Sequence, residues 1–343
     1  MKKNIFNIIL NETKKIHKGS KFKFLKNKTV LITGATGLLG NYMVAFFLNT
    51  LESKYSPKKI SLIFKNNLPS YLNFLKVNKK IDLIQKDLTK LNASNIKKQD
   101  YIIHLAGYGQ PFKFMKNEMK TFHLNTVTLE CLIRRTKSNG NFLYLSSSEI
   151  YSGLNGMVNE NQVGNTNTDH PRSCYIESKR GGETILNIYK KKLSIKAKSA
   201  RLCLAYGPGT KKGDARVLNQ FIEKGLSKKN ITMNDSGTAI RSYIYVADAT
   251  KMLLNILFFG KHSIYNVGGK EKISIKKLAN KIGKILKAPV MESSKIYSKK
   301  IGSPKHAMVD IGLYEKEFKK MSLTKLDEGL RNTIEWQRIV CKY

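Results

Sequence analysis

Acidic residues are scarce in this sequence, with 24 Asp and Glu against 62 Lys and Arg and a formal net charge of +38. Arginine is scarce as well, because only nine of the 62 basic residues are arginine. A strongly basic balance points to nucleic acid or an anionic surface, but reading bases and clamping phosphates favour arginine. The lysines are spread along the chain in pairs, without a nucleic-acid motif. We therefore interpret them as a solvated surface and predict no specific nucleic-acid partner.

Cysteine and long apolar runs are also few. The four cysteines (Cys131, Cys174, Cys203 and Cys341) stand far apart, with no C-x-x-C and no metal-ligand spacing. This pattern predicts reduced thiols, a reducing compartment and no metal site. No apolar run approaches the roughly 20 residues of a membrane span. We expect a cytoplasmic protein without stable membrane insertion.

The first 27 residues form a basic N-terminal extension. Its spacing predicts a short amphipathic helix over 4–16, either docked on the protein body or touching a membrane surface. Asparagines interrupt its apolar residues and no small-residue cleavage site follows, so the pattern is not that of a secretory signal.

From Lys28 onward, short β-type runs alternate with helical stretches. The expected strands are Thr29–Thr33, Ile60–Phe64, Ile81–Gln85, Tyr101–Leu105, Asn141–Leu145 and Ala197–Leu202. The expected helical segments are Leu38–Thr50, an irregular one near 68–76, Asn117–Lys137, Cys174–Lys192, Val217–Leu226, Val246–Phe259, Ile275–Leu286 and Leu323–Val340. This alternation predicts an α/β fold with a doubly wound parallel sheet buried on both faces, whose ligands bind at the carboxyl ends of the strands.

After Tyr206 the elements become shorter and less regular. We predict a nucleotide-binding domain over 28–204 and, over 205–343, mainly a smaller C-terminal α/β substrate lobe with some segments returning to the first domain.

The first chemical motif is a glycine-rich turn between the first strand and the first long helix. Glycines let the backbone approach a pyrophosphate, whose charge then meets the helix N-terminus. The predicted cofactor-binding residues of this turn are Gly34, Thr36, Gly37, Leu38, Leu39 and Gly40.

Two further strand ends carry candidate cofactor contacts. Asp87 and Leu88 follow the third strand, where a carboxylate can accept a hydrogen bond from an adenine amino group. The fourth strand ends in a histidine followed by Leu105, Ala106 and Gly107, and the small residues among these let a cofactor cross the strand end. We interpret His104 itself as a core histidine.

The decisive pair is Tyr175 and Lys179, which lie at i and i+4 and so share one helix face. A nearby ammonium favours phenolate and makes a tyrosine usable as a general base. After the fifth strand, Ser147 can bind a substrate hydroxyl, and Glu149 brings a carboxylate to the same place. We predict Ser147, Glu149, Tyr175 and Lys179 as the catalytic residues.

Together, T-G-x-x-G-x-x-G, the strand-end serine and Y-x-x-x-K resemble the extended short-chain dehydrogenase/reductases that modify nucleotide sugars. The resemblance runs from about Lys28 to Gln337 and includes Arg201 to Gly209 and Gly237 to Asp248. It implies a Rossmann-like fold, bound NAD, a homodimer and a nucleotide-sugar substrate. It also implies that Asn125 belongs to the cofactor site and that Arg241 binds the nucleotide diphosphate.

Within this family, the segments that begin at Ser147, Arg172 and Asp214 are similar to those of UDP-glucuronate decarboxylases, which adds Ser148 and Arg216 as substrate-binding candidates. The 4,6-dehydratases carry an acid where this chain has Ser148. Simple 4-epimerases usually lack the glutamate at position 149.

The chain departs from the family pattern at three places. Leu204 replaces a sugar-contacting asparagine. The arginine that helps to hold the substrate carboxylate in decarboxylases aligns near Ala307, with Lys305 and His306 as possible substitutes. Lys65 stands near the usual ribose-binding aspartate, which leaves NADP possible beside NAD.

The resemblance therefore implies an NAD-dependent enzyme that oxidises C4 of a nucleotide-linked sugar to a 4-keto intermediate, with UDP-glucuronate decarboxylation favoured and 4-epimerisation or 4,6-dehydration as alternatives. A rival of another class is a non-catalytic nucleotide- or RNA-binding protein on the same fold. For the dimer, the apolar residues expected to be in excess on the two long helices are Leu124, Val127, Cys131, Ile185, Leu186 and Ile188.

Overall fold

The computed structural model describes residues 5–17, 20–91, 96–292 and 306–340. Its centre is a sheet of seven parallel strands in the order β11-β7-β5-β4-β1-β2-β3. These strands are β1 (Thr29–Thr33), β2 (Lys59–Phe64), β3 (Ile81–Gln85), β4 (Gln99–His104), β5 (Thr136–Ser147), β7 (Lys196–Leu202) and β11 (Ile264–Val267). The strand order reverses between β1 and β4, which is where ligands of such sheets bind. The predicted doubly wound α/β fold is confirmed.

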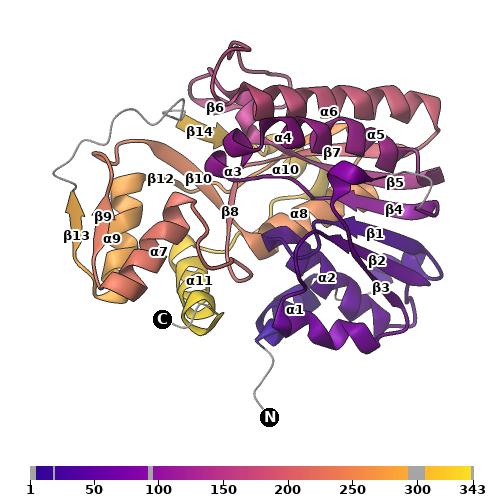
Figure 1. The fold of residues 1–343 in the computed structure, drawn as a ribbon, viewed down its shortest axis with the longest axis horizontal. Helices are drawn as coiled ribbons and strands as arrows, with labels where there is room; N and C mark the ends of the chain where they lie inside the picture. Colours follow the sequence, from indigo (N-terminus) through magenta and orange to yellow (C-terminus); the bar gives the residue numbers. More distant parts are fainter. Residues whose placement is uncertain (1–4, 18–19, 92–95, 293–305, 341–343) are drawn as a thin grey trace.

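Helices cover both faces of this sheet (Figure 1). One layer holds α3 (Pro111–Lys116), α4 (Glu118–Asn125), α5 (Val127–Ile133) and α6 (Ser173–Lys192). The opposite layer holds α1 (Phe6–Ile16), α2 (Leu38–Leu51) and α8 (Val246–Phe259). Because both faces are covered, the central strands read as nearly continuous apolar runs.

The N-terminal helix α1 packs on α2, and its residues Phe6 and Ile9 are fully buried. Of the two placements considered for this segment, the structure has the docked one. Its Glu12 accepts hydrogen bonds from Tyr42 on α2 and from Tyr245 at the end of β10, the latter at 2.6 Å. The extension is therefore joined to both parts of the molecule.

The second part of the molecule is built on a small sheet in the order β12-β10-β14-β6, with β8 paired to β10. Its strands are β6 (Met157–Val158), β8 (Leu204–Tyr206), β10 (Ile240–Tyr245), β12 (Lys272–Ser274) and β14 (His306–Val309). A separate pair is formed by β9 (Ile231–Met233) and β13 (Val290–Glu292). The helices α7 (Val217–Lys228), α9 (Ile275–Leu286) and α11 (Leu326–Val340) pack beside these strands, and α10 (Gly312–Phe318) packs beside β11.

Some segments beyond residue 204 belong to the large sheet. β11 pairs with β7, and α8 packs on β5 and β7. The division of the chain into 28–204 and 205–343 as domains stays a prediction.

The prediction of one continuous helix over Asn117–Lys137 is wrong, because the structure has two shorter helices and the start of a strand there. α4 ends at Asn125, α5 spans Val127–Ile133, and β5 begins at Thr136. At the break, Thr126 has φ −118° and ψ −78°, and its hydroxyl donates to the carbonyl of Phe122 at 2.8 Å. A β-branched residue that bonds back to the preceding turn weakens a helix at that point.

Candidate active site

The glycine turn brings the start of α2 against the end of β4. Gly34 has φ +69°, and a Cβ there would lie 2.9 Å from the backbone nitrogen of Ala106. A Cβ on Gly40 would overlap the carbonyl oxygen of Gly34. Gly37 is the N-cap of α2 and supplies no side-chain cap. The N–H groups of the first turn of α2 are therefore not occupied by a capping side chain, and such a helix end binds anions.

At the next strand end the structure places Lys65 against Asp87. The ammonium lies 2.8 Å from Oδ2 of Asp87 and 3.3 Å from the hydroxyl of Tyr108. Thr89 donates to Oδ1 of Asp87 through its backbone nitrogen at 3.1 Å and its hydroxyl at 2.9 Å. Partial burial raises the pKa of Asp87, but the hydrogen bonds from Lys65 and Thr89 outweigh it and lower the pKa to about 2. Leu88, the next residue along the chain, is buried.

The segment after β4 lies against the end of β1. Leu105 donates from its backbone to the carbonyl of Thr33, and Ala106 donates to the hydroxyl of Thr33 at 3.2 Å. His104 is 1% exposed and hydrogen-bonded to that same hydroxyl at 2.8 Å. Burial lowers the pKa of His104 to about 3, so it is a neutral core histidine, as expected.

Tyr175 and Lys179 project from α6 toward the end of β5. Lys179 donates to the carbonyl of Leu145 at 2.7 Å, and its ammonium lies 5.6 Å from the centre of the Tyr175 ring. Burial lowers the pKa of Lys179 to about 7. Burial also raises the pKa of Tyr175 to about 12, against a hydrogen bond with Ser147 that lowers it. The three predicted residues are therefore brought together although Ser147 lies on another element.

Asn125 is fully buried at the end of α4 and ties that helix to α6. Its amide donates to Ser178 at 3.0 Å and to the carbonyl of Thr121 at 3.1 Å, and its oxygen accepts from Tyr144 at 3.3 Å. Asn125 thus supports the helix that carries Tyr175.

Glu149 lies in the short 3₁₀ segment Ser148–Tyr151 that follows β5. Arg172, the residue before α6, donates to Oε1 of Glu149 at 2.9 Å. Oε2 is buried and has no hydrogen-bond partner among the described residues. Burial raises the pKa of Glu149, while Arg172, Arg241 and His170 act in the opposite direction.

Sequence reasoning missed Phe114, which covers this cluster from α3. Its ring stacks on that of Tyr175 with centroids 4.5 Å apart and an interplanar angle of 11°. The guanidinium of Arg172 lies 5.5 Å from the centre of the same ring. No motif signals Phe114, because its role comes from a contact between separate elements.

Of the predicted substrate-binding residues, Arg241 and Arg216 lie on the small part of the molecule, and Ser148 follows β5 of the large sheet. Arg241 is on β10, and its charge interacts with that of Glu149. Arg216 precedes α7 and binds both oxygens of Asp214, at 2.9 and 2.6 Å. Ser148 follows Ser147 in the 3₁₀ segment.

The remaining departures from the family pattern also fall here. Ala307 pairs with Arg241 across β14 and β10, and Leu204 begins β8, where it pairs with Tyr243 of β10. Lys305 lies outside the described residues, and the side chain of His306 is not described.

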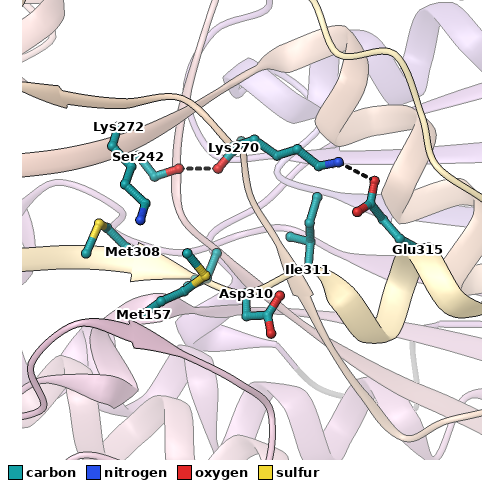
Figure 2. Close-up of a pocket in the computed structure, with 10 residues that line it drawn as sticks. Met157, Ser242, Lys270, Lys272, Met308, Asp310, Ile311 and Glu315 are labelled. Atoms are coloured by element: carbon teal, nitrogen blue, oxygen red, sulfur yellow. Dashed lines mark hydrogen bonds and ion pairs between the residues drawn. The ribbon is translucent and has the colours of Figure 1, made fainter.

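Figure 2 shows a separate pocket that Ser242 of β10 lines. Because neighbouring residues of a strand point to opposite faces, this pocket lies on the face of β10 opposite to that of Arg241. Lys270 in this pocket lies 2.6 Å from Glu315, and Ser242 donates to the carbonyl of Gly269. None of the predicted site residues lines it.

An uncapped helix N-terminus after a glycine turn, and a tyrosine–lysine pair at the carboxyl end of the same sheet, are features typical of dinucleotide-dependent enzymes. The model of the NAD dependent epimerase/dehydratase family matches residues 30–268, and the chain belongs to this family. It is an NAD-dependent enzyme, and the predicted family resemblance is confirmed.

Among curated relatives, UDP-glucuronic acid decarboxylase 6 of Arabidopsis thaliana is 28% identical over 91% of this chain and 89% of its own length. Among solved structures, a UDP-glucuronic acid 4-epimerase from Bacillus cereus superposes with a TM-score of 0.76, at 21% identity over 91% of this chain and 99% of its own. A dTDP-glucose 4,6-dehydratase from Streptomyces venezuelae has a TM-score of 0.78, at 18% identity over 90% of this chain and 96% of its own. The structural likenesses show the shared fold.

The residues present fit NAD. Adding a side chain at Gly34 would push it into the backbone of Ala106, so the turn keeps the close packing that a pyrophosphate needs. At Gly107 an added Cβ would meet, among the described residues, the Lys179 ammonium alone, at 4.0 Å, which leaves space at the end of β4. Among the described residues, no helix has the length and apolar character needed to cross a bilayer.

Proposed function

We propose that this enzyme oxidises C4 of a nucleotide-linked sugar and decarboxylates UDP-glucuronate. The observation that carries the proposal is the position of Glu149, a buried carboxylate in the same cluster as Ser147, Tyr175 and Lys179. The likeness to UDP-glucuronic acid decarboxylase 6 over most of both chains supports this choice of reaction.

The cofactor is held at the carboxyl ends of the strands. The glycine turn and the first turn of α2, from Gly34 to Gly40, bind the pyrophosphate. Asp87 receives the adenine amino group, with Leu88 packed beneath the base. Leu105, Ala106 and Gly107 leave room along β4, and Lys179 binds the nicotinamide ribose.

The Lys65–Asp87 ion pair favours NAD over NADP. Its geometry means that the lysine charge is already compensated at the sheet edge, where a 2′-phosphate would bring two negative charges.

The first chemical step is proton removal from the C4 hydroxyl. Bound NAD supplies the acceptor, and later the donor, of the hydrogen and two electrons exchanged with C4. Tyr175 Oη takes the hydroxyl proton, and Ser147 orients that hydroxyl. Burial raises the pKa of Tyr175. When Lys179 is protonated, its ammonium, 5.6 Å from the centre of the Tyr175 ring, favours the phenolate and opposes that effect.

The second step uses the 4-ketone as an electron sink. The bond from C5 to its carboxyl carbon breaks, CO₂ leaves, and the electron pair moves to the ketone oxygen as an enolate. A proton must then be added at C5 before C4 is reduced again. Glu149 supplies that proton from Oε2, because burial raises its pKa and Arg172 occupies only Oε1.

The substrate enters between the two parts of the molecule. Arg241 binds the diphosphate, while Ser148 and Arg216 contact the rest of the substrate. Ser148 stands where the 4,6-dehydratases have an acidic residue. The chain therefore lacks a proton donor at this position for expelling a C6 hydroxyl, which disfavours 4,6-dehydration.

Mass spectrometry of products from a panel of UDP-, GDP-, CDP- and dTDP-sugars tests this function. The expected result is loss of CO₂ from UDP-glucuronate alone. An epimer of unchanged mass, separated by chromatography, would replace the proposal with 4-epimerisation. No conversion of any sugar together with binding of the nucleotides would favour a non-catalytic protein.

We also propose a homodimer formed through α4, α5 and α6. Four large apolar side chains on these helices are exposed: Met119 (81%), Phe122 (41%), Val127 (47%) and Ile188 (44%). A second copy of the chain is the proposed occupant, because exposed apolar groups on neighbouring helices suit an isologous interface. Two residues expected on this face are instead buried inside the subunit, since Leu124 is 8% and Leu186 is 1% exposed.

Sedimentation tests the dimer. The native chain should sediment as a dimer at micromolar concentration, and Met119→Glu should shift it to monomer. The matched control is Met291→Glu, since Met291 is also exposed (44%) but lies on β13. A monomeric native chain would refute the proposal.

We place the enzyme in the cytoplasm. Cys131, Cys174 and Cys203 are free thiols, which suits a reducing compartment. Fractionation of cells that express a tagged chain should recover it with cytoplasmic markers, and recovery with an oxidising compartment would contradict this placement.

A further inference from the structure

Arg172 is the most enclosed charged side chain of the active-site cluster, and no role was assigned to it from the sequence. Its side chain is 4% exposed, against 20% for its partner Glu149. It enters the cluster at the N-cap of α6, three residues before Tyr175. Its backbone nitrogen donates to His170 at 3.1 Å, which fixes the start of its side chain.

Two contacts to described residues help to place the guanidinium. Nη2 donates to Oε1 of Glu149 at 2.9 Å, and the face of the group lies over the ring of Phe114. Phe114 is itself buried, being 1% exposed, and its ring stacks on that of Tyr175. The guanidinium is thereby held on one side by a ring that is itself packed in the site, and a planar cation suits this arrangement better than an ammonium does.

The two oxygens of Glu149 are consequently not equivalent. Oε1 is engaged by Arg172, while Oε2 is buried without a partner among the described residues. A buried oxygen without a hydrogen bond is costly unless a ligand or water satisfies it. The bound sugar is the group that the cluster is arranged to receive.

We propose that Arg172 is a positioning residue for the step after oxidation: by anchoring Oε1 of Glu149 it makes Oε2 the atom that exchanges a proton with the sugar. This inference rests on the proposed function, because it specifies how Glu149 acts in it. Arg172 itself makes no contact with substrate in this scheme.

The other charged groups around Glu149 do not replace Arg172. Arg241 on β10 and His170 in the loop before α6 also act on its charge, and Tyr175 faces it from α6. When a nucleotide sugar binds, the diphosphate takes up the charge of Arg241. Arg172 is then the remaining guanidinium beside the carboxylate, and its loss raises the pKa of Glu149 further.

The first step should be less sensitive to Arg172. The positive charge of Arg172 lowers the pKa of Tyr175, while the negative charge of Glu149 raises it. If Arg172 is removed, Glu149 holds its proton over a wider pH range, so both influences on Tyr175 disappear together. The pair acts on Tyr175 nearly as a neutral unit.

The experiment compares the full-length enzyme with Arg172→Met and Arg172→Lys, using UDP-glucuronate. Formation of reduced nicotinamide is followed by absorbance, and CO₂ release is followed in parallel across the pH range. In Arg172→Met we expect steady-state turnover to slow by about 10²-fold, the typical cost of a misplaced catalytic group. Because C5 is protonated after CO₂ has left, one CO₂ per active site should still be released rapidly, with reduced nicotinamide accumulating afterwards. The limb on which steady-state turnover falls with rising pH should move to higher pH, and Arg172→Lys should restore turnover in part.

Arg180→Met is the matched control. Arg180 lies on the same helix and donates to the carbonyl of Ile150 at 3.0 Å, so its loss loosens the segment that carries Glu149 without removing the Arg172 contact. This variant should leave the pH profile in place. An unchanged profile and unchanged nicotinamide accumulation in Arg172→Met would overturn the inference. If the native enzyme itself releases no CO₂ from UDP-glucuronate, the proposed function has failed instead.

Discussion

Tyr175→Phe isolates the proton transfer from the rest of the site. The substitution removes one hydroxyl and keeps the ring, so the stack on Phe114 at 4.5 Å is retained. Ser147 loses its hydrogen bond to the phenol but still accepts from the backbone nitrogen of Glu149 at 3.2 Å. Loss of one hydrogen bond changes folding stability by about 1 kcal/mol, which leaves the enzyme folded. Nucleotide-sugar affinity should hardly change, since Arg241 and the glycine turn are untouched.

Turnover should behave differently, because Tyr175 is the group assigned to take the C4 proton. A positioned general base contributes about 10²–10⁴ in rate, which corresponds to about 3–5 kcal/mol of barrier. The assay is a single turnover that follows reduced nicotinamide, with affinity measured separately by calorimetry. Tyr189→Phe, farther along the same helix, is the control and should leave the rate unchanged. Normal product formation by Tyr175→Phe would refute the whole mechanism.

Three further outcomes follow from the same structure. Glu149→Gln should still reduce bound NAD and then stall before C5 is protonated, seen as a persistent reduced-nicotinamide absorbance; loss of both steps would assign Glu149 to binding. Denaturing the purified enzyme should release NAD(H), because the redox cycle is closed and Lys65 is paired with Asp87 at 2.8 Å; release of NADP(H) would make Lys65 the phosphate ligand. Asp100→Asn should destabilise the fold by about 1 kcal/mol at neutral pH after allowance for solvent screening. Partial burial raises the pKa of Asp100, but hydrogen bonds from Lys137 and Thr29 lower it to about 2, below its ordinary value of 3.8. Its stabilisation is therefore present above pH 3.8 and lost as the pH falls toward 2, and thermal unfolding of both proteins across this range should show the gap closing.

Local pattern in the sequence accounts for much of the cofactor site. The glycine turn could be placed from spacing alone, because Gly34 needs a left-handed conformation and the following apolar residues begin a helix. The pair Tyr175 and Lys179 was equally accessible, since an i,i+4 spacing fixes a shared helix face. The alternation of strands and helices likewise predicted the parallel sheet. The glycine turn, the tyrosine–lysine pair and each strand or helix are all patterns within a few consecutive residues, so the sequence alone reveals them.

The tertiary structure alone decided which distant groups meet. Arg172 and Glu149 are 23 residues apart and come together because the start of α6 lies beside the segment after β5. Phe114 reaches Tyr175 from α3. No period in the sequence reports such contacts, since they depend on how separate elements pack.

The same limit explains what was misjudged. Leu124 and Leu186 are apolar helix residues that sequence alone could not divide between the subunit interior and an interface, and packing placed both inside. The spacing of apolar residues also predicted a single helix that continues past Thr126. In the structure a hydrogen bond from the Thr126 side chain to the preceding turn marks a break at that point. The pairing of Thr136 with Gln99 then begins β5 before the predicted end of the helix. The sequence by itself determined the fold class, the cofactor turn and the tyrosine–lysine pair. The environment of Glu149 was settled by tertiary packing, because burial and the approach of Arg172 exist only in the folded chain.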